Sequence, residues 1–287
     1  MSISYFAECT VLITGASAGI GREFARQLAP IVNTMVLVAR RYDRLEALEL
    51  ELKIVNPRLE VFCRQLDLRD QSELERFCDW LDESGLSVDL LVNNAGLGDR
   101  GAFIDSEWER LHSILQVNMV ALTYLTYRIL PGMRKSGCGA ILNVSSVVGF
   151  FPIPNFAVYA ATKAYVTSFS EALRVELRNS NISVTAVCPG PVPSEFNDVA
   201  SRLPQGHAAP MPELFTVSVQ EVVRTALQAV SRDRARVIPG TLVNLLTTTL
   251  IFIPMFLKRL ILNLQAAREQ ASSSPATARG YEISGMV

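Results

Sequence analysis

The sequence predicts an α/β protein with one doubly wound, seven-stranded parallel sheet and helices on both faces. Short apolar runs alternate with segments of helical periodicity, an order typical of strand–helix–strand units. The strand-like runs are rich in Val, Ile and Leu without polar alternation, as expected when helices cover both faces of a sheet. A glycine-rich turn follows the first run, where such a fold joins its first strand to its first helix.

Seven strands are expected, and each is a short apolar run. In chain order they are Thr10–Thr14, Met35–Ala39, Val61–Gln65, Leu90–Asn93, Ala140–Val144, Ser183–Cys188 and a short strand at Arg236–Ile238. Helical patterns fill the intervals at Gly21–Ala29, Arg44–Val55, Gln71–Glu83, Trp108–Arg134, Val158–Arg178 and Val219–Ser231. The motif Asp70-Gln-Ser-Glu73 predicts a capping box, in which the first and fourth residues satisfy each other's backbone N–H groups.

The composition excludes several classes of protein. The 287 residues are 49% hydrophobic and 19% charged, which supplies one large core. A net charge of -1 offers no basic field for a nucleic acid. The five cysteines show no metal-binding spacing, so we expect reduced thiols and no metal site. The N-terminal residues lack the basic and apolar regions of a secretory signal, which predicts a cytoplasmic protein.

Tyr159 and Lys163 are the residues that most directly suggest catalysis. They stand four positions apart in a predicted helix, so they share one helix face. A phenol ordinarily titrates near pH ~10, and a neighbouring ammonium group lowers its pKa. Ser146 ends an apolar run thirteen residues before the tyrosine. The three residues together predict an acid–base centre, whereas a Tyr/Lys pair alone is more often a feature of a helix surface.

The turn Thr14-Gly-Ala-Ser-Ala-Gly-Ile-Gly21 follows the first predicted strand. Glycines allow the backbone to approach a pyrophosphate closely, and the helix that follows offers unpaired N–H groups. The spacing is GxxxGxG rather than GxGxxG, and a tight corner between strand and helix is the alternative. The position after the first strand favours nucleotide binding.

In combination these motifs resemble the short-chain dehydrogenase/reductase family. The resemblance covers residues 8–240 and rests on five segments in the family's order and spacing. It implies a Rossmann fold and hydride transfer between a nicotinamide cofactor and a carbonyl or alcohol group. The segments are Thr14–Gly21, Asn93-Asn-Ala-Gly96, Asn118, the set Ser146/Tyr159/Lys163, and Pro189-Gly190.

The resemblance implies a role for each candidate catalytic residue. Tyr159 would donate a proton to the carbonyl oxygen or remove one in the reverse direction, and Lys163 would lower the phenol pKa and hold the ribose hydroxyls. Ser146 would hydrogen-bond the substrate oxygen. Ser145 competes for that role, but adjacent strand residues point to opposite faces, and the offset from the tyrosine favours Ser146. Asn118 would position a water molecule that passes protons to Lys163, or would satisfy backbone groups as buried asparagines often do.

The same resemblance predicts the residues that bind the cofactor. Asp67 and Leu68 would bracket the adenine, and Ser194 stands where the family often has a threonine that contacts the carboxamide. Asn93 would both line the cofactor site and stiffen the central strand. The full set, apart from two arginines, is Thr14, Gly15, Ser17, Ala18, Gly19, Ile20, Gly21, Asp67, Leu68, Asn93, Ala95, Gly96, Tyr159, Lys163, Pro189, Gly190, Val192 and Ser194.

The predicted cofactor is NADP(H) rather than NAD(H). Proteins that use NAD tend to carry a carboxylate after the second strand that binds the ribose 2′-hydroxyl, whereas arginine accommodates a 2′-phosphate. Here the strand ends in Ala39, followed by Arg40 and Arg41. We expect Arg40 to be the principal partner of the phosphate and Arg41 a weaker one.

Residues 1–240 are expected to form a single Rossmann-fold catalytic domain with a substrate lid at 191–216. Five prolines and few regular patterns in that segment favour a mobile lid. Phe150–Pro154 and Phe156 lie between the serine and the tyrosine, so we expect them at the mouth of the pocket, although core packing explains some of them equally well. An apolar wall there favours a lipophilic ketone, of the 3-oxoacyl or steroid type, over a sugar.

The segment 241–265 is unusually apolar. It is interrupted by Asn244 and Pro254 and is shorter than the ~20 apolar residues of a membrane-spanning helix. Three roles stay open: a lid over the active site, a dimer arm, or an element lying on a membrane surface through 241–264. Residues 266–287, with many Ser, Ala and Gly, are expected to be disordered.

Two functional hypotheses follow. The first is an NADP-dependent oxidoreductase that reduces a lipophilic ketone, assembled as a homodimer or homotetramer as members of the family commonly are. The second is a nucleotide-binding sensor or scaffold on the same fold, whose tail binds a membrane or a partner. A sensor would be expected to lose Ser146, Tyr159 or Lys163, and all three are present. The sequence therefore favours the enzyme.

Overall fold

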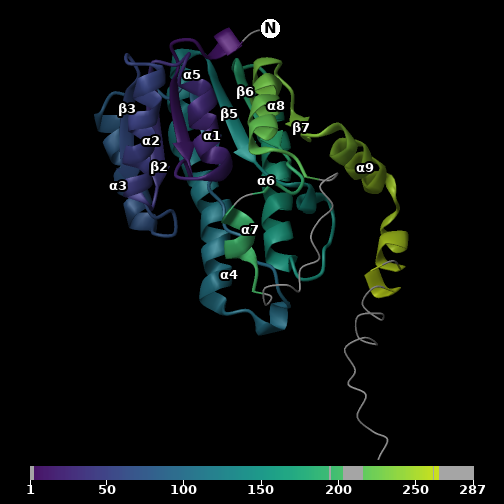
Figure 1. Ribbon diagram of the computed structural model, residues 1–287. Helices are drawn as coiled ribbons and strands as arrows, with labels where there is room; N and C mark the ends of the chain where they lie inside the picture. Colours follow the sequence, from purple (N-terminus) through teal and green to yellow (C-terminus); the bar gives the residue numbers. More distant parts are fainter. Residues whose placement is uncertain (1–2, 194, 203–215, 261, 265–287) are drawn as a thin grey trace, which may run out of the picture. The chain divides into compact units, whose positions relative to one another are not determined.

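A parallel seven-stranded sheet organises the computed structural model, which describes residues 3–193, 195–202, 216–260 and 262–264 (Figure 1). The strand order is β3-β2-β1-β4-β5-β6-β7, and every neighbouring pair is parallel. This confirms the predicted fold class. The strands are β1 (Thr10–Thr14), β2 (Thr34–Ala39), β3 (Glu60–Gln65), β4 (Leu90–Asn93), β5 (Gly139–Val144), β6 (Ile182–Val187) and β7 (Arg236–Val237).

The helices occupy the predicted intervals, and α3 and α8 have the predicted bounds. The α-helices of the described residues are α1 (Gly19–Leu28), α2 (Tyr42–Val55), α3 (Gln71–Glu83), α4 (Trp108–Leu115), α5 (Leu122–Ser136), α6 (Ala157–Glu176), α7 (Glu195–Ala200), α8 (Val219–Ser231) and α9 (Thr241–Phe252). Shorter helical turns are η1 (Ile3–Phe6), η2 (Phe103–Asp105), η3 (Gln116–Ala121) and η4 (Val147–Phe150).

Two apolar layers hold the helices on opposite faces of the sheet. Side chains of α1, α2 and α8 share one core, and side chains of α3, α5 and α6 share the other. Side chains along β1 alternate between the two cores: Val11 and Ile13 belong to the first core, and Leu12 belongs to the second. Each fully buried aliphatic side chain contributes roughly 1.5–3 kcal/mol relative to exposure. The doubly covered sheet therefore forms a rigid platform for the loops at its carboxyl edge.

The long helix predicted over Trp108–Arg134 is not regular. The π-helical turn η3 separates α4 from α5 and contains the candidate residue Asn118, whose exposed fraction is 1%. Single π-helical turns accommodate one extra residue and occur mostly at functional sites. Apolar periodicity does not reveal such an insertion, so the prediction of one uninterrupted α-helix is wrong.

The capping box predicted at α3 forms only in part. The Asp70 carboxylate accepts hydrogen bonds from the backbone N–H groups of Ser72 (2.8 Å) and Glu73 (3.0 Å), as an N-cap does. The Glu73 carboxylate accepts instead from the backbone N–H of Asp67, at 2.9 Å. Glu73 thus closes the loop between β3 and α3 and holds a predicted cofactor residue in place.

The carboxyl ends of the parallel neighbours β1 and β4 lie side by side in the middle of the strand order. The chain passes from β1 to β2 and β3 on one side and later returns to β4 on the other. Open α/β sheets bind ligands at such a switch point, outside the carboxyl ends of the strands. Thr14 and Asn93, the last residues of β1 and β4, therefore mark the expected binding edge.

The chain forms two compact units, residues 1–247 and 248–287. In the first unit, Val243 belongs to the core and Thr247 is buried. Among the described residues no single helix is long and apolar enough to cross a membrane, although α9 and the helix Met255–Leu264 pass that test as a bent pair. The role of the segment 241–265 stays a prediction.

Residues 194 and 203–215 of the predicted lid, and the tail 266–287, lie outside the described residues.

Candidate active site

The predicted acid–base residues meet at the start of α6. Tyr159 and Lys163 have exposed fractions of only 9% and 4%. The Lys163 ammonium donates to the carbonyl oxygen of Val144 at 2.8 Å, and its nitrogen lies 5.7 Å from the centroid of the Tyr159 ring. The hydroxyl of Ser146 is hydrogen-bonded to the Tyr159 phenol and lies 3.3 Å from the carbonyl oxygen of Pro189. The structure therefore brings the serine, the tyrosine and the lysine into one buried group.

Burial dominates the ionisation of this group. Removal from water raises the pKa of Tyr159 to about 12, and the hydrogen bond with Ser146 opposes that rise only in part. Burial lowers the pKa of Lys163 to about 8. The expectation that Lys163 lowers the tyrosine pKa is therefore wrong for the protein chain on its own. At neutral pH the phenol keeps its proton, which is the form that can act as an acid.

Ser145 belongs to the scaffold rather than to this group. Its hydroxyl donates to the carbonyl oxygen of Lys163 at 2.8 Å and shares a hydrogen bond of 2.7 Å with Thr167. The residue is 3% exposed. Ser146, and not Ser145, acts as a hydrogen-bond partner that lowers the Tyr159 pKa; the catalytic role expected of Ser146 from its offset to the tyrosine stays a prediction.

Asn118 contacts the same group through η3. Its side-chain oxygen accepts from the backbone N–H of Leu97 at 2.8 Å, and its amide donates to the Leu97 carbonyl at 2.9 Å and to Thr162 at 3.0 Å. The side chain thus satisfies backbone groups, one of the two predicted alternatives. A Cβ atom on Gly96 would lie 3.4 Å from both the Asn118 oxygen and the Lys163 nitrogen, so these three residues surround one point.

A close-packed turn at the end of β1 has the backbone features of a pyrophosphate site. The Thr14 hydroxyl accepts from the backbone N–H groups of Asn94 and Ala95, at 3.0 Å each, and ties β1 to β4. Gly15 has a φ of +68°, which favours glycine. A Cβ atom on Gly21 would lie 2.3 Å from the Gly15 oxygen, so the first turn of α1 can approach the strand only with glycine there. Backbone N–H groups that start a helix bind anionic groups, so this turn fits a dinucleotide.

The other residues predicted in this region have varied surroundings. Ala18 is the N-cap of α1, and Gly19 begins the helix. Ile20 packs against the core. Asn93 donates to the side chains of Asn143 (2.9 Å) and Thr126 (3.1 Å), so it stiffens the buried centre of the sheet. Of its two predicted tasks, the hydrogen bonds account for the structural one.

Arg40 and Asp67 line a cavity of about 600 Å³ at the carboxyl edge of β2 and β3. Among the described residues, Arg40 forms no ion pair. Asp67 is paired with Arg69, which lowers the pKa of its carboxyl group. Leu68, the other residue expected at the adenine, packs against the second core.

Arg41 lies against the glycine loop, in contrast to Arg40. Its guanidinium is 3.3 Å from the Ser17 hydroxyl and 3.0 Å from the carboxylate of Glu195. Arg44, in the first turn of α2, contacts the same carboxylate at 2.9 Å. Sequence analysis did not single out Arg44 or Glu195. The two residues are 151 positions apart, and nothing in the sequence around either of them indicates that they come into contact.

The loop after β6 reaches the same site. The Pro189 carbonyl accepts from the backbone N–H of Val147 at 3.0 Å, Gly190 is partly buried, and Val192 packs in the core. Ser194 lies outside the described residues. Phe196, near the start of α7, has its ring centroid 5.6 Å from that of Tyr159.

The aromatic residues expected at the pocket mouth divide into two groups. Phe156 lies beside Tyr159, with ring centroids 6.3 Å apart. Phe150 packs instead against the core and under the guanidinium of Arg236, at 5.0 Å. The guanidinium of Arg100 lies 5.7 Å from the Phe156 ring centroid. An aromatic ring therefore borders the tyrosine, and a cation lies over that ring.

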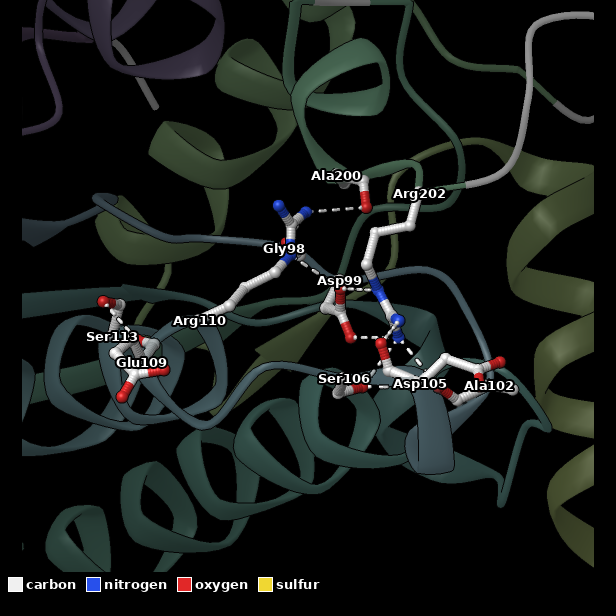
Figure 2. Close-up of polar contacts among 10 residues, drawn as sticks. All are labelled: Gly98, Asp99, Ala102, Asp105, Ser106, Glu109, Arg110, Ser113, Ala200 and Arg202. Carbon is white, nitrogen blue, oxygen red and sulfur yellow. Dashed lines mark hydrogen bonds and ion pairs between the residues drawn. The ribbon is translucent and has the colours of Figure 1, made fainter.

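Figure 2 shows a cluster that anchors the end of α7 beside the site. Asp99 is 5% exposed and accepts hydrogen bonds from Arg110 (2.7 Å) and from Arg202 (2.7 and 3.0 Å). Arg110 also donates to the carbonyl oxygen of Ala200, the last residue of α7, at 3.1 Å. A short parallel bridge joins Arg100 to the residue after α7. The loop after β4 and the loop after β6 are thus held together.

The fold and this site define a nicotinamide-dependent oxidoreductase, and comparison with known proteins agrees. The short chain dehydrogenase family model matches residues 9–203. The chain belongs to the short-chain dehydrogenase/reductase family and is an NAD(P)-dependent enzyme that interconverts alcohol and carbonyl groups.

Two curated relatives act on small acidic compounds by name. Sulfoacetaldehyde reductase 2 of Chromohalobacter salexigens is 38% identical over 191 residues, which cover 65% of this chain and 73% of the relative. The NADP-dependent 3-hydroxy acid dehydrogenase YdfG of Escherichia coli K12 is 34% identical over 237 residues, covering 81% of this chain and 92% of the relative.

Two solved structures match almost the whole chain. A short-chain dehydrogenase of Sphingobium yanoikuyae in complex with NADPH has a TM-score of 0.74 and 33% identity, covering 96% of this chain and 99% of its own. The bulky-bulky ketone specific alcohol dehydrogenase of Comamonas testosteroni has a TM-score of 0.70 and 29% identity, covering 95% and 97%.

Proposed function

We propose that the protein is an NADPH-dependent reductase of bulky, lipophilic ketones. The carrying observation is the position of two aromatic rings, Phe156 and Phe196, against the buried Tyr159 that is hydrogen-bonded to Ser146. An apolar wall around a proton donor suits a carbonyl flanked by large apolar groups, because such groups bury their surface there.

Each member of the buried group has a distinct task in this proposal. Tyr159 donates its proton to the carbonyl oxygen, which it can do because the buried phenol is protonated at neutral pH. Ser146 donates a hydrogen bond to the same oxygen as negative charge develops. Lys163 holds the ribose hydroxyls. Asn118 keeps the Leu97 loop against the site through its three hydrogen bonds.

The cofactor, when bound, supplies the hydride. Its pyrophosphate would lie on the turn Thr14–Gly21, and its adenine beside Asp67 and Leu68. A preference for NADP(H) is supported by the absence of a carboxylate at Ala39 and by the arginines that follow it. The NADP-dependent relative of Escherichia coli and the structure with NADPH support the same preference.

The similarity to a bulky ketone dehydrogenase along 95% of this chain supports a lipophilic substrate. Exposed apolar side chains along the segment 241–264 support a binding role for this segment, either toward another subunit or toward a membrane surface. They are Leu245, Leu246, Leu250, Phe252, Met255, Phe256, Leu257, Leu260 and Leu264. A homo-oligomer and a cytoplasmic location stay predictions.

A second candidate substrate class is a small anionic aldehyde or 3-oxo acid. Arg100 carries the observation, since its guanidinium lies over the Phe156 ring beside Tyr159 and forms no ion pair among the described residues. An arginine in that place could bind a carboxylate or sulfonate. The two curated relatives act on substrates of this kind by name.

The two classes are distinguished by steady-state NADPH oxidation with an aryl alkyl ketone and with a 3-oxo acid. The proposal expects the higher kcat/KM with the ketone, and Phe156→Ala should lower that value about tenfold because it removes part of the apolar wall. Phe103→Ala, on the exposed η2, is the matched control and should have no effect. Activity confined to the acid and lost in Arg100→Gln would replace the first candidate by the second.

A further inference from the structure

The carboxylate of Glu195 lies against two arginines that follow β2, the part of the fold where arginines are expected to bind an NADP(H) 2′-phosphate. Arg41 contacts both the Ser17 hydroxyl of the glycine loop and this carboxylate, and Arg44 contacts both carboxylate oxygens, at 2.9 and 3.0 Å. The two arginines lower the pKa of Glu195, so the group is ionised at neutral pH. An internal anion therefore already neutralises the arginines nearest to the loop.

The same short helix also reaches the catalytic tyrosine. Phe196, the next residue, has its ring 5.6 Å from that of Tyr159. A Cβ atom on Gly98 would lie 2.7 Å from the Phe196 ring, so the phenylalanine fills the space between the loop after β4 and the tyrosine. At its other end α7 is held by Arg110 and by the backbone N–H of Arg100, which donate to Ala200. The start of α7 can thus move only about an anchored end.

We propose that Glu195 competes with the 2′-phosphate of NADP(H) for Arg41 and Arg44, and that its displacement shifts Phe196 along the Tyr159 ring, so that the apolar wall makes room for the ketone. Arg44 and Glu195 then determine cofactor specificity together with the residues after β2. The inference rests on the proposed preference for NADP(H) and explains how the correct cofactor opens the substrate site. NADH lacks the phosphate and leaves α7 in place.

Exposure of the ion pairs makes this competition feasible. The side chains of Arg41, Arg44 and Glu195 are 43%, 41% and 57% exposed, and exposed pairs of this kind are weak. A phosphate monoester carries about twice the charge of a carboxylate and offers three acceptor oxygens. The phosphate should therefore displace Glu195 readily, at a modest loss of affinity.

The first test is calorimetric titration with two ligands that differ only in the 2′-phosphate, adenosine 2′,5′-bisphosphate and adenosine 5′-monophosphate. Glu195→Gln should tighten binding of the bisphosphate about fivefold and leave the monophosphate unchanged. Arg44→Gln should weaken the bisphosphate alone. In a protein that already carries Arg41→Gln and Arg44→Gln, the substitution Glu195→Gln should no longer increase the affinity for the bisphosphate. Glu221→Gln, which breaks an ion pair on α8, is the control and should change neither ligand.

The second test follows Phe196. A Phe196→Trp variant should shift its fluorescence emission when the bisphosphate saturates the protein, but not with the monophosphate. The unsubstituted chain, which has two tryptophans, gives the background. An unchanged bisphosphate affinity in Glu195→Gln, or an unchanged emission in Phe196→Trp, would overturn the inference while leaving the proposed function intact. If the wild-type protein binds both ligands equally, the preference for NADP(H) itself is wrong.

Discussion

The ammonium group of Lys163 donates to the backbone carbonyl of Val144 at 2.8 Å. This bond ties α6 to the end of β5 and keeps the lysine nitrogen 5.7 Å from the centroid of the Tyr159 ring. One hydrogen bond does not replace the water that a buried ammonium loses, so the pKa of Lys163 falls to about 8. The site therefore holds a group that weakens the fold in its charged form.

Replacing this lysine should stabilise the protein chain. In the unfolded chain a lysine titrates near 10.5, so between pH 8 and 10.5 the unfolded state holds more protons at Lys163 and stability rises with pH. Below pH 8 the full penalty applies. Lys163→Met removes that penalty and also the bond to Val144, so we expect a net gain of about 1–2 kcal/mol in the free energy of unfolding at pH 7.

Urea unfolding at pH 7 and pH 10 measures this effect. The gain should be largest at pH 7 and should shrink at pH 10, while reductase activity is lost. Lys135→Met, on an exposed position of α5, should change stability by less than ~0.5 kcal/mol. A Lys163→Met variant that is less stable than wild type at pH 7 would show that the hydrogen bond outweighs desolvation.

The glycine turn makes a second prediction. A Cβ atom on Gly21 would lie 2.3 Å from the Gly15 oxygen and 2.5 Å from the Asn94 amide, so Gly21→Ala should push α1 off β1. We expect a loss of ~1–3 kcal/mol in stability and at least tenfold weaker NADPH binding. Gly132→Ala is the control, because no atom lies within 4 Å of its added Cβ, and it should stabilise α5 by ~0.5–1 kcal/mol. Equal thermal midpoints for the two variants would contradict the close packing at Gly21.

Local sequence patterns predicted the helices and strands of this fold well, because apolar runs and helical periodicity are local features of the sequence. Val, Ile and Leu runs such as Val11–Ile13 identify strands covered on two faces, and Ser145, which the offset from the tyrosine disfavoured, is hydrogen-bonded to the scaffold. Asn118 shows the limit of this reasoning. The π-helical turn around it depends on packing against the Leu97 loop, which apolar periodicity does not encode.

Long-range pairs and ionisation were beyond sequence reasoning. The contact of Glu195 with Arg41 spans 154 residues and is set by the path of the loop after β6. The tyrosine pKa was predicted from the charge of Lys163 alone, whereas the burial of the tyrosine side chain decides it. Burial depends on how the loops close over α6, which only the folded structure reveals.

The Asp99 cluster should control the position of α7. Asp99→Ala removes the shared carboxylate of two partly buried arginines, so we expect a loss of about 1–3 kcal/mol in stability. Because α7 carries Phe196, the KM for the ketone should rise about tenfold, with a smaller change in kcat. Asp79→Ala, which removes a 62% exposed partner of Arg128, should cost less than ~1 kcal/mol and leave KM unchanged. An unchanged KM in Asp99→Ala would separate the cluster from the substrate site.

Removal of the second unit tests the apolar segment. A chain that ends at Thr247 keeps the buried Val243 and Thr247, so its thermal midpoint should stay within a few degrees of wild type. Light scattering after size exclusion measures whether the truncated chain has lost a subunit contact. Co-sedimentation with vesicles of zwitterionic and anionic lipids measures whether it has lost membrane binding. We expect one of these two losses. Identical behaviour of the two chains in both assays would leave the exposed apolar side chains without a binding role.

The central claim is that Tyr159 donates the proton in an NADPH-linked ketone reduction. Its most direct test is kcat/KM for the aryl alkyl ketone in wild type and Tyr159→Phe, with NADPH binding measured by fluorescence in the same samples. We predict a loss of at least ~10²-fold in kcat/KM, because general acid catalysis contributes ~10²–10⁴-fold, and a Kd for NADPH that rises by no more than about threefold, because at most one hydrogen bond to the cofactor is lost. A Tyr159→Phe protein that binds NADPH and reduces the ketone at the wild-type rate would contradict the account.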